Sequence, residues 1–218
     1  MTDIGRQRAG AGRASYAEQA RELLHERLLV AADDLLAERD WATITMADIA
    51  KGAGVSRQTL YNEFGSRPEF AQAYVLREAD RFVGIVEQAI IDHAGDPEAA
   101  LAAALTGVLS EAADNALVRA IRAEEPSGGL LALVTTQGAP VIGSAVDRLA
   151  ALFAMTWPGL PERQARVAAD CATRLAISHA LLSVSSPERT GPQIASVIGP
   201  YLQAQTAPDM DIAYERHE

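Results

Sequence analysis

The sequence predicts an all-α protein with a small N-terminal domain and a larger C-terminal helical domain. Apolar residues recur at three-to-four-residue spacing along most of the chain, and no segment shows the two-residue alternation of a β-strand. Glycine and proline interrupt these periodic segments at 95–97, 126–129, 138–140 and 157–161, which divides the chain into separate helices. With 218 residues, the chain is long enough for two domains.

The composition is that of a globular protein, with 49% hydrophobic and 22% charged residues. No run of about 18 apolar residues is present, and no apolar stretch of a signal peptide follows the N-terminal arginines. We therefore expect a cytoplasmic protein without a membrane partner. Cys171 is the only cysteine, so neither an intramolecular disulfide nor a cysteine-based zinc site can form. We expect Cys171 to be a small buried residue.

The N-terminal region predicts an arm followed by a long helix. Residues 1–15 combine arginine with many glycines and alanines, and we expect them to form a disordered basic arm. A helix is then predicted from about residue 16 to residue 40, because leucine and alanine recur there at helical spacing. Trp41 follows directly and is expected to be a packing anchor.

Residues 45–64, TMADIAKGAGVSRQTLYNEF, predict two short helices joined by a tight turn. Thr45 can cap the first helix and Ser56 the second, and glycines at 52 and 54 end the first. The residues expected to be buried are Met46, Ile49 and Ala50 in the first helix, with Leu60 and Phe64 in the second. This pattern is typical of a helix-turn-helix, whose second helix enters the major groove of DNA. An ordinary pair of core helices is the alternative.

A third helix is predicted to begin directly after this pair. Ser66 can cap it, Glu69 completes a capping box and Pro68 suits its first turn. The order VSxxTLYxxFxSRxEF, over residues 55–70, resembles the TetR family of bacterial transcriptional regulators. The resemblance spans residues 24–74. It implies a helix-turn-helix DNA-binding domain and a C-terminal domain that binds a ligand and forms the dimer.

The resemblance also implies DNA contacts for seven residues. Arg57, Gln58, Thr59 and Asn62 fall where the family contacts base edges, and Thr45, Tyr61 and Arg67 fall where phosphates are bound. The Arg57 guanidinium can bind guanine O6 and N7 together, whereas Gln58 and Asn62 suit adenine. Glu63 departs from the family pattern, because an acid so close to DNA must either turn away or pair with Arg67. If Glu63 is only tolerated there, Glu63→Gln should tighten non-specific binding.

The net charge of −10 is unusual for a protein that binds phosphates. Residues 1–75 carry nine Lys or Arg against eleven Asp or Glu, whereas residues 76–218 carry ten against eighteen. Most of the excess acid is therefore C-terminal. The basic arm can reach phosphates or the minor groove, and an idle tail is the alternative.

These patterns place a helix-turn-helix DNA-binding domain at 16–66, a ligand-binding and dimerisation domain at 67–203 and a disordered tail at 204–218. A long helix over 66–93 joins the first two, and the resemblance implies that it acts as a lever between DNA and the effector cavity. Further helices are expected at 97–115, 117–124, 129–136, 141–156, 161–185 and 192–203.

A homodimer is expected because a palindromic operator on double-stranded DNA needs two readers related by a twofold axis. The last two helices occupy the position where the family forms a four-helix dimer interface. Ala168, Ala172 and Ala176 step by four along one face, and such small residues let a partner helix approach closely. An intramolecular face is the alternative for this stripe.

The predicted function is a ligand-responsive transcriptional repressor, and the alternative is a helical DNA-binding adaptor regulated by a protein partner. An apolar cavity in the C-terminal domain would favour the first. No GxSxG, Walker A, HExxH, CxxC or glycine-rich dinucleotide motif is present, so neither enzyme activity nor a cofactor is expected. The four histidines lack paired ligand spacing, so no metal site is expected.

The effector is expected to be small and apolar, because the helices of the C-terminal domain are mostly aliphatic. The stretch YNEFGSRPEFAQAYVLREADR resembles an actinobacterial subset of the family associated with alkane or fatty-acid metabolism, which implies a fatty acid or acyl derivative. The candidate ligand-binding residues are Phe82, Ile85, Leu105, Leu109 and Phe153 for the tail, with Arg174 or His179 for the head. In the alternative, Arg174 pairs with Asp170 one turn back, and His179 lies at the dimer seam.

Overall fold

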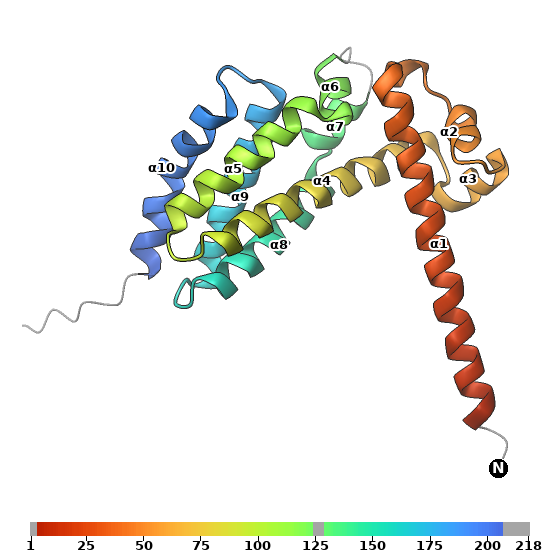
Figure 1. Cartoon of the computed structure of the whole chain (residues 1–218), viewed down its shortest axis with the longest axis horizontal. Coiled ribbons are helices and arrows are strands. Elements are labelled where there is room, and N and C mark those ends of the chain that lie inside the picture. The colour runs from red at the N-terminus through yellow and green to blue at the C-terminus, as the bar shows by residue number, and fades with distance from the viewer. Residues whose placement is uncertain (1–3, 124–128, 207–218) are drawn as a thin grey trace, which may run out of the picture. The chain divides into compact units, whose positions relative to one another are not determined.

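The computed structural model describes residues 4–123 and 129–206, which form helices and no strands (Figure 1). The all-α prediction is confirmed for these residues. They fall into two compact units, residues 4–74 and residues 75–123 with 129–206. The boundary between the units lies after Tyr74, inside a continuous helix, rather than after residue 66 as expected.

The N-terminal unit contains α1 (Ile4–Glu38), a 3-10 turn η1 (Trp41–Thr43), α2 (Met46–Gly52), α3 (Arg57–Phe64) and the first turns of α4 (Arg67–Asp92). Because α1 begins at Ile4, residues 4–15 of the expected disordered arm are helical, and residues 1–3 lie outside the described part of the chain. Alanine and arginine have high helix propensity, and adding residues to an existing helix is much easier than starting one.

Gly54 closes the turn between α2 and α3. Its φ of +68° lies in the left-handed region, which a residue with a Cβ rarely adopts. Arg27 of α1 donates a hydrogen bond of 2.7 Å to the carbonyl of Ala53 at the end of α2. The turn that sets the angle between α2 and α3 is therefore held against α1.

The C-terminal unit contains the rest of α4, then α5 (Pro97–Asp114), α6 (Ala116–Ala123), α7 (Leu130–Val134), α8 (Ala139–Thr156), α9 (Glu162–Leu181) and α10 (Pro187–Thr206). Pro187 starts α10 earlier than the expected start at Pro192, which lies inside the helix. Proline is favoured at a first helical position, and Pro187 meets that condition. Residues 207–218 of the expected tail lie outside the described residues.

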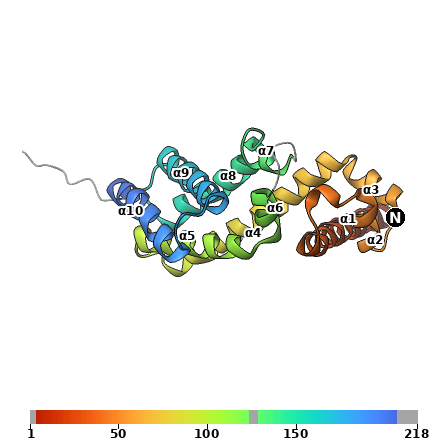
Figure 2. The ribbon, with the colours of Figure 1, turned by 90° about the horizontal axis from the view of Figure 1, so that it is seen from above.

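Helices α5 and α10 pack side by side (Figures 1 and 2). Two glycines of α10 permit this. A Cβ on Gly199 would lie 2.6 Å from Glu98 Cβ, and one on Gly191 would lie 2.7 Å from the Thr106 backbone nitrogen. Both distances are far below van der Waals contact, so the two backbones meet where side chains are missing.

Among the described residues, one helical stretch, Leu130–Thr156, is long and apolar enough to cross a membrane by length and composition alone. The pair α5 and α6 meets the same criteria only if joined across a bend of 69°. Val146, Leu149 and Phe153 of α8 are buried in the hydrophobic core of the C-terminal unit. This packing accounts for the apolar composition of the stretch.

Candidate functional site: a nucleic-acid interface and an apolar cavity

The outer face of α3 carries four of the seven predicted DNA-binding residues. Arg57, Gln58, Tyr61 and Asn62 are exposed and follow helical spacing, whereas Leu60 and Phe64 are buried on the opposite face. Gln58 Nε2 donates a hydrogen bond of 2.8 Å to Asn62 Oδ1. Arg57 and Tyr61 have no hydrogen-bond partner within the described part of the chain, so both polar groups are available to an external ligand.

The hydroxyl groups of Thr45 and Thr59 both take part in hydrogen bonds at the N-terminus of a helix, Thr45 at α2 and Thr59 at α3. Ser56 Oγ accepts the Thr59 N–H at 3.0 Å, and the two hydroxyl oxygens lie 2.8 Å apart. Thr45 Oγ1 accepts the Asp48 N–H at 3.2 Å, while the Asp48 carboxylate accepts the Thr45 N–H at 2.9 Å. The backbone hydrogen bond from Thr45, followed by that from its hydroxyl, lowers the pKa of Asp48. The predicted helix caps, Thr45 and Ser56, are both confirmed. DNA contact by the Thr45 and Thr59 hydroxyls stays a prediction.

Arg67 lies against Trp41. Its guanidinium donates a hydrogen bond of 2.6 Å to the Trp41 carbonyl, and Cζ lies 4.5 Å from the centre of the indole ring. This pairing joins the start of α4 to η1. The predicted phosphate contact of Arg67 would have to form from this packed position.

Glu63 turns away from the exposed face of α3. Its carboxylate accepts a hydrogen bond of 2.7 Å from Arg21 Nε and lies 2.8 Å from His25 Nε2, both on α1. The hydrogen bond from Arg21, followed by that from His25, lowers the pKa of Glu63. The His25 ring also stacks on Phe64, with ring centres 4.5 Å apart. Of the two predicted outcomes, turning away is confirmed and pairing with Arg67 is wrong, because Glu63 pairs with Arg21 of α1 while Arg67 binds the Trp41 carbonyl.

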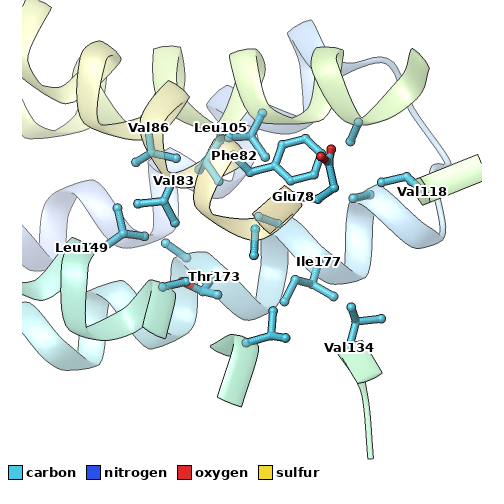
Figure 3. Close-up of a pocket in the computed structure, with 18 of the residues that line it drawn as sticks. Glu78, Phe82, Val83, Val86, Leu105, Val118, Val134, Leu149, Thr173 and Ile177 are labelled. Carbon is cyan, nitrogen blue, oxygen red and sulfur yellow. The ribbon is translucent and has the colours of Figure 1, made fainter. Parts of the chain in front are cut away.

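The C-terminal unit contains a partly open apolar cavity of about 140 Å³ (Figure 3). Side chains from α4, α5, α6, α8 and α9 form most of its wall, and Val134 of α7 adds to it. The described lining residues are apolar except for Glu78 on α4 and Thr173 on α9. The volume is far more than a single water needs, which is about 10–15 Å³ on the same kind of measure.

Three of the seven predicted ligand-binding residues line this cavity, namely Phe82, Leu105 and Phe153. The other four do not. Ile85 packs toward Gly107 of α5, and Leu109 and His179 border a separate space of about 60 Å³ beside Arg122. Arg174 is exposed and pairs with Asp170, with Nε 2.9 Å from Oδ2, so the alternative for this residue is confirmed. Arg174 lies on the outer face of α9 and does not line the cavity.

Two polar residues of the cavity wall were not predicted from the sequence. Glu78 is 2% exposed, and its carboxylate accepts hydrogen bonds of 2.7 Å from Asn115 Nδ2 and from Arg77. Thr173 is 8% exposed, and its hydroxyl oxygen has no hydrogen-bond partner among the described residues. Glu78 lies one helical turn before Phe82 on the same face of α4, which is the one signal that could have indicated it.

The alanine stripe of α9 lies inside the C-terminal unit. Ala168 and Ala172 are buried, and Ala172 and Ala176 line the cavity, so the intramolecular alternative is correct. The opposite face of α9 exposes Cys171, which was expected to be buried. The exposed large apolar residues of α9 and α10 are Val167, Leu175, Val197 and Tyr201, and Leu182 directly after α9 is also exposed. A helix buries only the faces that its neighbours cover, and the sequence did not identify which face of α9 this is.

Comparisons with known proteins follow the same division of the chain. The family model "Bacterial regulatory proteins, tetR family" matches residues 28–74, and "Bacterial Tetracyclin repressor, C-terminal domain" matches residues 96–200. The HTH-type transcriptional regulator AlkX of Mycobacterium tuberculosis is 37% identical over 191 residues, which cover 88% of this chain and 90% of that protein. The HTH-type transcriptional activator FasR of Mycolicibacterium smegmatis is 33% identical over 86 residues, or 39% of each protein.

The solved structures that are similar over most of the chain include one of a TetR family repressor. The TetR family repressor AlkX from Dietzia sp. strain DQ12-45-1b, implicated in biodegradation of n-alkanes, is 37% identical. It superposes with a TM-score of 0.75, covering 84% of this chain and 97% of that one.

Proposed function

This chain belongs to the TetR family of bacterial transcriptional regulators, and on that premise we propose that it is a ligand-responsive repressor. As a homodimer it binds a palindromic operator in the cytoplasm, and a small apolar effector releases it. The apolar cavity of about 140 Å³ in the C-terminal unit carries this proposal, because a regulator controlled only by a protein partner needs no such space.

The outer face of α3 reads the operator in this proposal. Arg57 and Tyr61 have free polar groups on that face, and Gln58 and Asn62 can exchange their mutual hydrogen bond for bonds to a base. Because the Glu63 carboxylate pairs with Arg21 and lies beside His25 on α1, it is held away from the exposed face that makes this contact.

The dimer is formed by the outer faces of α9 and α10. These faces expose Leu175, Leu182, Val197 and Tyr201, which isolated protomers would leave in water. Replacing Leu175 and Val197 together by glutamate should give a monomer by size-exclusion chromatography with light scattering. The same variant should lose most of its operator affinity, because two half-sites can no longer be bound at once.

Helix α4 provides the coupling between effector and DNA. Its first turns belong to the N-terminal unit, and Glu78, Phe82 and Val86 farther along line the cavity. An effector that binds the non-DNA-binding arrangement more tightly lowers operator affinity, and operator DNA lowers effector affinity by the same factor.

Titration of the protein–operator complex with aliphatic ligands tests the proposal. The operator is first selected from random double-stranded DNA, and its release is followed by fluorescence anisotropy. Aliphatic ligands of medium chain length should release it, whereas Ala176→Phe, which fills the cavity, should bind operator but resist release. Ala151→Phe, which makes the same substitution at an exposed position of α8 outside the cavity, is the matched control and should respond like the native protein. If no apolar ligand releases the operator, the protein-partner reading replaces this one.

A further inference from the structure

Resting on the proposed function, we infer that the effector is an uncharged aliphatic molecule with one hydroxyl or carbonyl oxygen, and that the Thr173 hydroxyl binds this oxygen. An aliphatic alcohol is the simplest molecule of this class. The sequence predicted instead a head group bound by Arg174 or His179, neither of which lines the cavity.

Thr173 is the residue of the cavity wall whose unpaired hydroxyl indicates a polar group on the ligand. It lies in the middle of α9, is 8% exposed and lines the cavity (Figure 3). A threonine hydroxyl inside a helix commonly bonds to the carbonyl one turn earlier, which satisfies it locally. Thr173 Oγ1 has no such partner among the described residues. A buried hydroxyl left unpaired is costly, and a rotation of Thr173 about χ1 that turns the hydroxyl into the cavity would let a ligand oxygen relieve that cost.

The composition of the wall disfavours an anionic head group within the cavity. None of the described lining residues is a lysine, arginine or histidine. A carboxylate held within the cavity would lose its hydration without gaining a cation from the described wall. An ionised fatty acid is therefore a poor fit to this cavity.

A cationic head group is also disfavoured, because Glu78 is already paired. Asn115 Nδ2 and Arg77 each donate a hydrogen bond of 2.7 Å to its carboxylate, and Arg81 lies 3.6 Å away. A new cation would have to compete with these partners. Thr173 is then the polar group of the wall that remains to be satisfied.

A hydrocarbon fits the wall but leaves the Thr173 hydroxyl unpaired. A site with a buried polar group binds the analogue that lacks the matching group more weakly. The cavity should therefore distinguish three ligands of equal chain length, with the alcohol bound more tightly than either the alkane or the carboxylate.

Octane, 1-octanol and octanoate at pH 8 provide this comparison, with decane, 1-decanol and decanoate as a second set. Isothermal titration calorimetry measures binding to the native homodimer, and anisotropy measures operator release. The alcohol should bind about ten-fold more tightly than its alkane or carboxylate, as expected for one buried hydrogen bond.

Thr173→Val tests the role of the hydroxyl, because valine keeps the shape and removes the oxygen. The variant should bind operator normally, which reports its folding, and should lose the preference for alcohol over alkane. Thr173→Ser should retain the preference, and Ser144→Ala, which removes an exposed hydroxyl from α8, is the matched control.

These measurements distinguish failure of the Thr173 inference from failure of the proposed function. If Thr173→Val keeps the alcohol preference, or if the carboxylate binds best, the inference is wrong while the ligand-responsive repressor stands. If none of the six ligands binds the native protein or releases the operator, the proposed function fails and the inference fails with it.

Discussion

Asn115 connects Glu78 of α4 to the first turn of α6. Its Nδ2 donates a hydrogen bond of 2.7 Å to the Glu78 carboxylate, and its Oδ1 accepts the Val118 N–H at 3.0 Å. Asn115 is 7% exposed and Glu78 is 2% exposed, so water cannot replace either bond readily. A single side chain thus caps one helix and satisfies a buried carboxylate at the cavity wall.

Asn115→Ala should lower the free energy of unfolding of the C-terminal unit by about 2–4 kcal/mol, because it removes a helix cap and leaves Glu78 with fewer donors. Urea unfolding measures this through Trp157, in a Trp41→Phe background that leaves Trp157 as the only tryptophan. Asn115→Asp keeps the cap acceptor but adds a like charge beside Glu78, and it should also destabilise at neutral pH. A loss below about 0.5 kcal/mol for Asn115→Ala would contradict this account.

Arg57→Ala should cost about 1–3 kcal/mol of binding free energy for the operator and relax base preference at one position in each half-site. The measurement is anisotropy with the operator and its single-base variants. Tyr61→Phe is the control, because removal of a phosphate-directed hydroxyl should weaken binding to all sequences alike and reduce the salt dependence. Equal losses on operator and random DNA for Arg57→Ala would exclude its role in reading bases.

Arg67→Lys should separate the structural role of Arg67 from its predicted phosphate contact. Lysine keeps the charge but cannot reproduce the planar stacking on Trp41 together with the hydrogen bond to its carbonyl. The N-terminal unit should lose about 1–2 kcal/mol of stability, followed by Trp41 fluorescence in a Trp157→Phe background. Operator binding at low temperature, where the unit stays folded, should keep its salt dependence. Because lysine keeps the charge, the phosphate contact is tested by Arg67→Gln, and a flattened salt dependence in that variant would assign Arg67 chiefly to a phosphate.

Glu63→Gln should destabilise the N-terminal unit at neutral pH by less than about 1 kcal/mol, because Arg21 is largely exposed. Since folding lowers the pKa of Glu63, its carboxylate contributes stability above its ordinary value of 4.5, and this is lost as pH falls through the lower pKa of the folded state. The native protein and the variant should therefore converge in stability at acid pH. Non-specific DNA binding should change little, in place of the tightening that the sequence suggested, and a clear increase would show that Glu63 still repels DNA.

Gly199→Ala should destabilise the C-terminal unit by about 1–3 kcal/mol, because the new Cβ would lie 2.6 Å from Glu98 Cβ and 2.9 Å from its Cα. Gly143→Ala in α8 is the matched control, since a Cβ there meets no atom within 4 Å. Alanine should stabilise the helix at that position by about 0.5–1 kcal/mol. Thermal unfolding of both variants measures the contrast, and shifts of the same sign would refute the close packing of α5 and α10.

The helix-turn-helix could be predicted because its determinants are local. Thr45 and Ser56 cap helices through residues three positions later, and Leu60 and Phe64 share a face through helical spacing alone. These relations depend on backbone geometry within a few residues, so they can be predicted from the amino-acid sequence alone. The same is true of the exposed face with Arg57 and Tyr61, which follows once the buried face is known.

Tertiary packing decided which neighbour each remaining face meets. Spacing showed that Ala168 and Ala172 share a face of α9, but only the folded unit turned that face inward and left Cys171 outside. The partners of Glu63 lie 38 and 42 residues away on α1, and the Asn115 that satisfies Glu78 lies 37 residues away. Periodicity determines which residues share a face of a helix but not which neighbours that face meets, so the sequence determined the fold class and the exposed face of α3. The cavity and its unpaired Thr173 hydroxyl depend on how separate helices pack together.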